Sequence, residues 1–247
     1  MNIFRSRFKK EIVTEFVRPV IDSNKVIILC TGMPGYPGKR EDLLSFLADK
    51  GYWVFLPRYR GSWESDGSFL KESPHQDVLD IIDELETGFI ELWGGNKFMI
   101  NKPEVYLVGV SFGGPAALLA SRDSRVKKVV AMSPVVDWKI ESEAEPFDHL
   151  AQFMIDGFGN GYRCDMEDFH KLQKGSFYNP IDEIESLDSS KIKIIHAKND
   201  EVVYFAPTEN FAKKLGCEFV ALETGGHLST SLILLPEFWS EIKAFIE

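Results

Sequence analysis

Apolar runs alternate with amphipathic stretches along most of this chain. The runs are rich in branched and aromatic residues, which is typical of strands buried on both faces. They lie at 26–30, 52–57, 104–110, 126–132, 191–197 and 219–222. Between them, apolar residues recur at helical spacing, most clearly at 41–50, 75–92 and 205–215. This alternation predicts an α/β fold in which helices flank a mostly parallel central sheet.

Two stretches depart from this alternation. Residues 11–18 alternate polar and apolar positions, which predicts an early, half-exposed strand. Residues 135–190 are acidic and aromatic, with helical pieces at 147–158 and 165–174 but no apolar strand. We interpret 135–190 as an insertion that forms a small lid over the carboxyl ends of the strands. Because no linker or repeat divides the chain, we expect a single domain over 1–247.

Composition narrows the class of protein. The 247 residues are 44% hydrophobic, which is ample for a large core, and the net charge of −10 argues against a nucleic-acid partner. No apolar run reaches the roughly 18 residues of a membrane span, and no signal-peptide core follows the basic amino terminus. Three cysteines without Cys-x-x-Cys spacing indicate neither a disulfide framework nor a zinc site. We therefore expect a cytoplasmic protein without a membrane partner, and the sequence leaves its oligomeric state open.

A candidate nucleophile lies where one of these runs ends. The segment Gly109–Gly113 has the pattern Gly-x-Ser-x-Gly between an apolar run and an alanine- and leucine-rich stretch, which predicts a strand, a sharp turn and a helix. At such a corner Ser111 adopts a strained backbone conformation and points off the end of the sheet. The next amide, on Phe112, begins the helix and can donate to an oxyanion. The alternative is a glycine-rich corner whose serine only caps the helix.

A serine hydroxyl is a weak nucleophile and needs a base, which a third group must orient. With a corner of this kind, the order along the chain is serine, acid, histidine. His227 fits this order, because it follows a later strand and two glycines that let its loop bend. We predict Asp200, just beyond the strand ending at 197, as the acid, and Asp137 is its rival. His196 ends a buried strand and is interpreted as a packing histidine.

These motifs resemble those of the α/β-hydrolase superfamily. The resemblance depends on the serine corner, on Lys-Asn-Asp at 198–200 and on Gly-Gly-His at 225–227. Within the superfamily, Arg-Tyr-Arg-Gly-Ser-Trp at 58–63 and Ser-Pro-Val-Val-Asp-Trp at 133–138 resemble the catalytic domain of prolyl oligopeptidase-like and dienelactone hydrolase-like proteins. The likeness runs from about residue 26 to the end of the chain.

The resemblance implies a serine hydrolase that forms an acyl-enzyme without a metal or organic cofactor. The glycine- and proline-rich loop 31–38 would supply a second oxyanion amide, at Met33. Family members often have a histidine where this chain has Thr31, so the support of that loop must differ. The large propeller of the peptidases is missing from this chain, which weakens any transfer of their peptide specificity.

We expect the substrate to be a small ester or thioester, or a short peptide. A carboxylesterase-like reaction is the first prediction, and an acylaminoacyl or prolyl-type peptidase is the alternative. A hydrolase-fold protein that binds a ligand without turning it over is a third. Candidate substrate contacts are Tyr36, Arg60, Trp63 and Phe153. Arginines at strand ends more often brace loops through ion pairs, so a structural role for Arg60 stays open.

Overall fold

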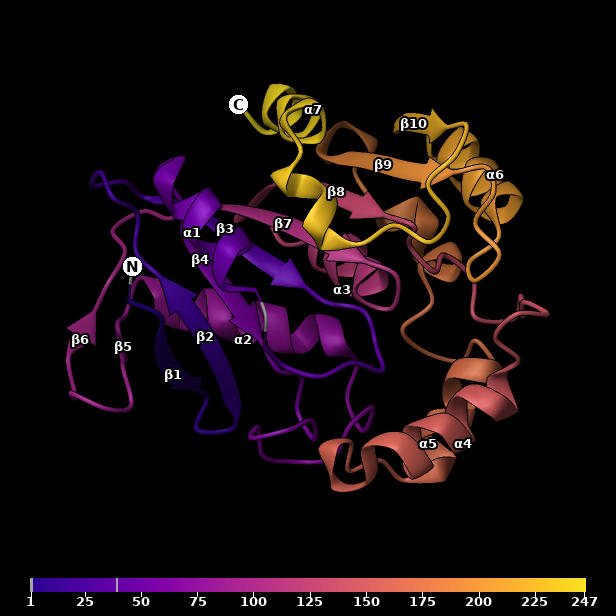
Figure 1. The fold of residues 1–247 in the computed structure, drawn as a ribbon, viewed down its shortest axis with the longest axis horizontal. Helices are drawn as coiled ribbons and strands as arrows, with labels where there is room; N and C mark the ends of the chain where they lie inside the picture. The colour runs from indigo at the N-terminus through magenta and orange to yellow at the C-terminus, as the bar shows by residue number, and fades with distance from the viewer. Residues whose placement is uncertain (1, 39) are drawn as a thin grey trace.

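An eight-stranded sheet forms the centre of the computed structural model, which describes residues 2–38 and 40–247 (Figure 1). The strand order is β1-β2-β4-β3-β7-β8-β9-β10. The parallel strands are β3 (Lys25–Cys30), β4 (Trp53–Pro57), β7 (Glu104–Val110), β8 (Val126–Met132), β9 (Ile192–Ala197) and β10 (Glu218–Leu222). At one edge, β1 (Phe4–Phe8) and β2 (Ile12–Val17) pair antiparallel. The mostly parallel sheet predicted from the alternation is confirmed.

Helices cover both faces of this sheet, as Figure 1 shows. One face packs against α1 (Glu41–Asp49) and α7 (Pro236–Ile246). The other packs against α2 (Pro74–Leu85), α3 (Gly113–Ala120) and α6 (Phe205–Leu215). Alternate residues of β3 separate the two cores, since Ile27 belongs to the first and Ile28 to the second. Full burial of successive strand residues explains why the runs read as continuously apolar.

The insertion 135–190 follows β8 and contains no strand among its described residues. Its helices are α4 (Phe147–Phe158) and α5 (Met166–Gln173), followed by 3-10 turns at Pro180–Ser186 and Ser189–Lys191. Figure 1 shows α4 and α5 set apart from the helices that cover the sheet. Both have an apolar side, because Phe147 of α4 contacts Phe169 of α5 with ring centroids 4.8 Å apart.

The strand β1 was not predicted. Its basic residues obscure an alternation in which Phe4 and Phe8 face the core while Arg5 and Arg7 lie between them. Phe4 stacks on Phe16 of β2 with ring centroids 5.4 Å apart. Arg5 instead forms an ion pair of 2.8 Å with Glu15, which also lies on β2. Pairing with β2, rather than apolar content, therefore makes this segment a strand.

The prediction that one helix continues from 75 to 92 is wrong. The helix α2 ends at Leu85, and Gly88 has a φ of +106°, which only glycine adopts readily. Phe89 then lies in a short strand, β5 (Phe89–Ile90), which pairs with β6 (Lys97–Phe98). Its ring packs on Phe8 and Phe16, so its apolar character belongs to the core and not to a helix face.

The site is positioned by a reversal in strand order. From β3 the sheet grows toward β4 on one side and toward β7 on the other. In parallel α/β sheets, ligands bind where the carboxyl ends of strands meet such a reversal. The loop 31–38 follows β3, and the serine corner follows β7, so both emerge at this point.

Candidate active site

The serine corner has the geometry that its glycines predict. Ser111 has a φ of +53°, a conformation that side chains other than glycine rarely adopt. A Cβ on Gly109 would lie 2.5 Å from the carbonyl oxygen of Gly113. A Cβ on Gly113 would lie 2.1 Å from the carbonyl oxygen of Cys30, on the neighbouring strand β3. Both positions therefore exclude any side chain, because the nearest atom that it would meet is a backbone oxygen in each case.

We predict that Gly113→Ala destabilises the fold by at least about 3 kcal/mol, since a fixed carbonyl must move to admit the methyl group. The measurement is urea unfolding. Gly35→Ala is a matched control, because its added Cβ meets nothing closer than 4.0 Å, and it should change stability by under about 1 kcal/mol. Equal stability of Gly113→Ala and the native protein would contradict the close packing of this corner.

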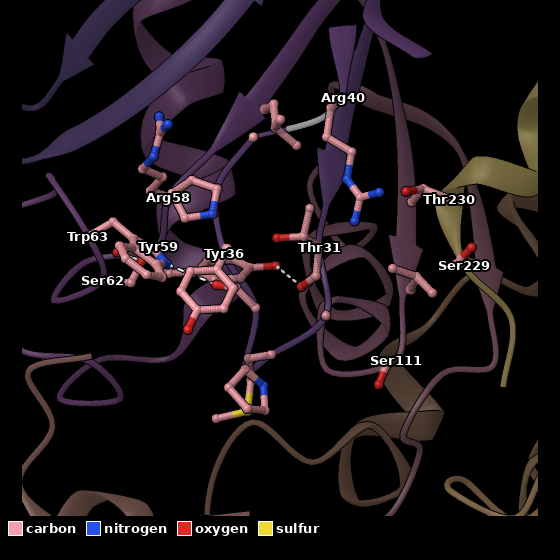
Figure 2. A pocket seen from close by; sticks show the side chains of 18 of the residues that line it. Thr31, Tyr36, Arg40, Arg58, Tyr59, Ser62, Trp63, Ser111, Ser229 and Thr230 are labelled. Carbon is pink, nitrogen blue, oxygen red and sulfur yellow. Dashed lines mark hydrogen bonds between the residues drawn. The ribbon is translucent and has the colours of Figure 1, made fainter. Parts of the chain in front are cut away.

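Thr31, at the start of the loop after β3, and Ser111 line the same cavity, which Figure 2 shows. A Cβ on Gly32 would lie 3.2 Å from the Cβ of Ser111. Among the described residues, neither the amide of Met33 nor that of Phe112 donates a hydrogen bond. Met33 lines the same cavities as Ser111, and Phe112 follows Ser111 in the chain. Free N–H groups at such a site can stabilise negative charge on an oxygen.

His227 is paired with Asp200. Its Nδ1 lies 2.9 Å from Oδ2 and 3.1 Å from Oδ1 of the carboxylate. The backbone amides of Val202 and Val203 each donate to Oδ1 at 3.0 Å, so the carboxylate is fixed from both sides. The rival acid, Asp137, instead accepts a hydrogen bond from the side chain of Asn179 at 3.3 Å. Of the two candidate acids, Asp200 is the one that contacts His227.

Sequence reasoning missed a second histidine at this carboxylate. His196 is fully buried at the end of β9, and its Nε2 lies 3.1 Å from Oδ2 of Asp200 and 3.0 Å from the carbonyl oxygen of Val203. Both neighbours accept hydrogen bonds, so Nε2 carries the proton. The other ring nitrogen has no partner in the described chain. The packing role predicted for His196 does not by itself account for the hydrogen bond that its Nε2 donates to Asp200.

Burial by itself raises the pKa of a carboxyl group, but at Asp200 hydrogen bonding outweighs it. Donors on His196, His227 and the backbone of Val203 hold the pKa of Asp200 well below its ordinary value. The carboxylate therefore stays charged at any pH where the protein is expected to work. A charged acceptor beside Nδ1 favours the tautomer of His227 whose Nε2 is free to take a proton.

The loop that carries His227 is tied at both sides. The amide of Gly226 donates to Oδ1 of Asn199 at 2.9 Å, and the amide of Leu228 donates to Oγ of Ser133 at 3.2 Å. His227 and Ser111 line the same cavity, although they make no direct hydrogen bond in the described chain. Hydrogen bonds of this kind are often long before substrate binds and shorten in the reacting complex.

Two cavities meet at Ser111. The large cavity has a volume of about 380 Å³ and includes Ser111, His227 and Met33 in its lining. The small cavity has a volume of about 60 Å³, and it shares Ser111 and Met33 but not His227. Three predicted substrate contacts, Tyr36, Trp63 and Phe153, line the large cavity, and Figure 2 shows the first two.

Arg60, the fourth predicted contact, lines neither cavity. Its Nε lies 2.6 Å from Glu11 and its Nη2 lies 2.7 Å from Asp80, and Asp77 forms a third ion pair. A guanidinium whose three nitrogens are each paired with a carboxylate braces its loop, and it lies outside both cavities. Its neighbour Arg58 lines the large cavity but is likewise paired, with Glu15 at 3.1 Å.

Within residues 2–38 and 40–247, no three His, Cys, Asp or Glu side chains are grouped as ligands of a metal ion. None of the helices described is long and apolar enough to cross a bilayer.

A family model described as the prolyl oligopeptidase family matches residues 41–230. This range includes the serine corner, Asp200 and His227. No curated protein matches the sequence closely enough to count as a relative.

Solved structures resemble the whole chain at low identity. An esterase of Pyrococcus furiosus has a TM-score of 0.69 and 16% identity, over 99% of this chain and 89% of that one. The α/β-hydrolase GrgF of Penicillium has a TM-score of 0.70 and 14% identity, over 99% and 97%. An acylaminoacyl peptidase of Pyrococcus horikoshii has a TM-score of 0.62 and 20% identity, and this chain spans only 40% of it. These likenesses establish the α/β-hydrolase fold.

Proposed function

This chain belongs to the prolyl oligopeptidase family and is a serine hydrolase, and from that premise we propose that it cleaves carboxylic esters through Ser111, His227 and Asp200. The observation that carries the proposal is the contact between His227 and Asp200 at the edge of the cavity that Ser111 also lines. The three groups come from loops after β7, β9 and β10, in the order expected of such a sheet.

In the proposed reaction, His227 removes the proton of Ser111 as its hydroxyl attacks the carbonyl carbon of the ester. The amides of Met33 and Phe112 stabilise the oxyanion that develops. The loss of one such donor costs about 3–4 kcal/mol of transition-state stabilisation in a well-studied protease. His227 then protonates the departing alcohol, and water releases the acyl group from Ser111.

Turnover of a short-chain p-nitrophenyl ester tests this function, with Ser111→Ala as the blank. Hydrolysis above that blank supports an enzyme, whereas covalent labelling without turnover supports a hydrolase-fold binding protein. Acylated amino-acid amides in the same panel test the peptidase alternative, which the family assignment favours. The substrate is proposed to be a small ester or thioester, with a short peptide as the alternative.

We further propose that 135–190 acts as a lid within a single domain. Tyr162 of the insertion is hydrogen-bonded through its hydroxyl to the amide of Gly35 at 3.0 Å. Phe158 contacts Tyr36 with ring centroids 4.8 Å apart. These contacts connect the insertion to the loop that holds the amide of Met33. A cytoplasmic location is also proposed, since all three cysteines are free thiols.

We propose a positioning role for His196, since its donor holds Oδ2 of Asp200. His196→Leu, which removes the donor, should lower kcat about tenfold and leave KM nearly unchanged. His196→Gln, which retains a side-chain N–H, should recover most of that loss. Steady-state kinetics and a melting temperature for each variant check this prediction. Equal kcat for both variants and the native enzyme would show that His196 serves packing alone.

A further inference from the structure

The two cavities at Ser111 differ in their access to His227. The large cavity includes His227 in its lining, and the small cavity does not. Phe112, the second predicted oxyanion donor, lines only the small cavity, whereas Met33 and Ser111 line both. Ser111 and Met33 thus lie between the two cavities, whereas His227 lies at the large cavity.

Proton transfer assigns each half of the substrate to a cavity. The imidazole that takes the serine proton must return it to the leaving group, so the leaving group lies on the side of His227. The tetrahedral carbon carries four groups: Oγ of Ser111, the oxyanion, the leaving group and the acyl chain. Once the first three are placed, the acyl chain points into the small cavity.

The small cavity admits only a short acyl chain. Its volume is about 60 Å³, which is about twice the share of one water molecule in the liquid and well below the roughly 150 Å³ cavity that holds benzene. Side chains of Val136, Trp138 and Leu150 line it, and all three are at least nine-tenths buried. Asp137, Glu141 and Glu145 also line the cavity, so its wall is apolar only in part. Its small volume and this apolar part suit an acyl group of about two to four carbon atoms.

The large cavity suits a bulky leaving group with a ring. Its volume of about 380 Å³ lies in the range of pockets that enclose a drug-sized ligand. Tyr36 and Phe153 line it and are 72% and 57% exposed, so a ring laid against them removes apolar surface from water. Trp63 packs beside Tyr36 with ring centroids 5.5 Å apart, which makes this wall continuous.

We propose that this enzyme deacylates esters that join a short acyl group, acetyl to butyryl, to a bulky, ring-bearing alcohol. This inference rests on the proposed function. The carbonyl carbon bonds to Oγ of Ser111 as its bond to the alcohol oxygen breaks, and His227 passes the serine proton to that oxygen. Water then adds its oxygen to the acyl carbon, and its proton returns to Ser111. The products are one short carboxylic acid and one alcohol.

A series of p-nitrophenyl esters from acetyl to octanoyl tests the acyl side, with Ser111→Ala as the blank. The kcat/KM should be highest between acetyl and butyryl and at least about tenfold lower for octanoyl. If octanoyl is cleaved as well as acetyl or better, the assignment of the small cavity is overturned. If no ester is cleaved above the blank, the proposed function itself fails, so the two failures are distinguishable.

Leu150→Ala enlarges the small cavity and should raise the ratio of hexanoyl to acetyl kcat/KM at least about tenfold. Leu172→Ala is the matched control, because Leu172 is also buried in the insertion but lines neither cavity. It should leave the ratio unchanged. Ile140→Ala gives a second readout if Leu150→Ala does not fold, since Ile140 lines the small cavity and is 45% exposed. An unchanged ratio in both enlarging variants overturns the proposal.

The leaving-group side is tested with benzyl acetate and 2-naphthylmethyl acetate, whose alcohols have similar acidity. The larger ester should show a KM at least about fivefold lower, because its second ring contacts the aromatic wall. Phe153→Ala should remove most of this difference. Equal KM values in the native enzyme would overturn the assignment of the large cavity.

Discussion

Ser111→Ala is expected to lower kcat for ester hydrolysis by about 10⁶-fold, the size of loss that follows removal of a nucleophilic serine in a well-studied protease. No other hydroxyl replaces it, since the corner directs this one side chain off the end of the sheet with a φ of +53°. The amides of Met33 and Phe112 still stabilise an oxyanion, so slow hydrolysis by water should persist.

A serine that lines neither cavity provides the control for Ser111→Ala. Ser186 is exposed and donates to the carbonyl oxygen of Glu183, so Ser186→Ala should retain native kcat. Both variants should melt at the native temperature within a few degrees. Ser111→Ala with near-native turnover would remove the serine from the proposed mechanism.

Asp200→Asn is expected to lower kcat by about 10⁴-fold with little change in KM. An amide keeps the shape of the side chain but can donate to Nδ1 of His227, which then carries its proton on Nε2. In that tautomer His227 cannot accept the serine proton. The contact of 2.9 Å between Oδ2 and Nδ1 makes this loss specific to Asp200.

Asp137→Asn decides between the two candidate acids. Its carboxylate contacts Asn179 rather than His227, so the loss of kcat should stay under about tenfold. Asp200→Asn and Asp137→Asn each remove one carboxylate, so the kcat values of the two variants can be compared directly at one pH. A loss in Asp137→Asn as large as that in Asp200→Asn would require a rearranged site in which the acids exchange roles.

Local sequence was sufficient to predict the strands and the turn that position the proposed site. The runs at 104–110 and 191–197 are buried on both faces, so their apolar character does not depend on details of packing. The corner at Ser111 was predictable because steric exclusion at Gly109 and Gly113 is a local requirement. The pairing of Asp200 with His227 followed from the fixed order of such groups around a parallel sheet.

Other features depend on contacts between distant segments. Phe89 continues a helical spacing along the chain, yet its ring packs on Phe8 and Phe16 of the first two strands. The contact of His196 with Asp200 depends on the turn that follows β9 and not on spacing alone. The ion pairs of Arg60 also join distant segments, because Glu11 lies in the turn between β1 and β2 and the other two carboxylates lie on α2.

The most direct test of the proposed mechanism is the site of covalent modification by a fluorophosphonate, mapped by mass spectrometry of peptides from the native enzyme. A hydroxyl activated by His227 beside two oxyanion donors should be the one that reacts. The mechanism predicts a single adduct on the peptide that carries Ser111 and no adduct in Ser111→Ala. An adduct on a different residue, or persistent labelling of Ser111→Ala, would contradict it.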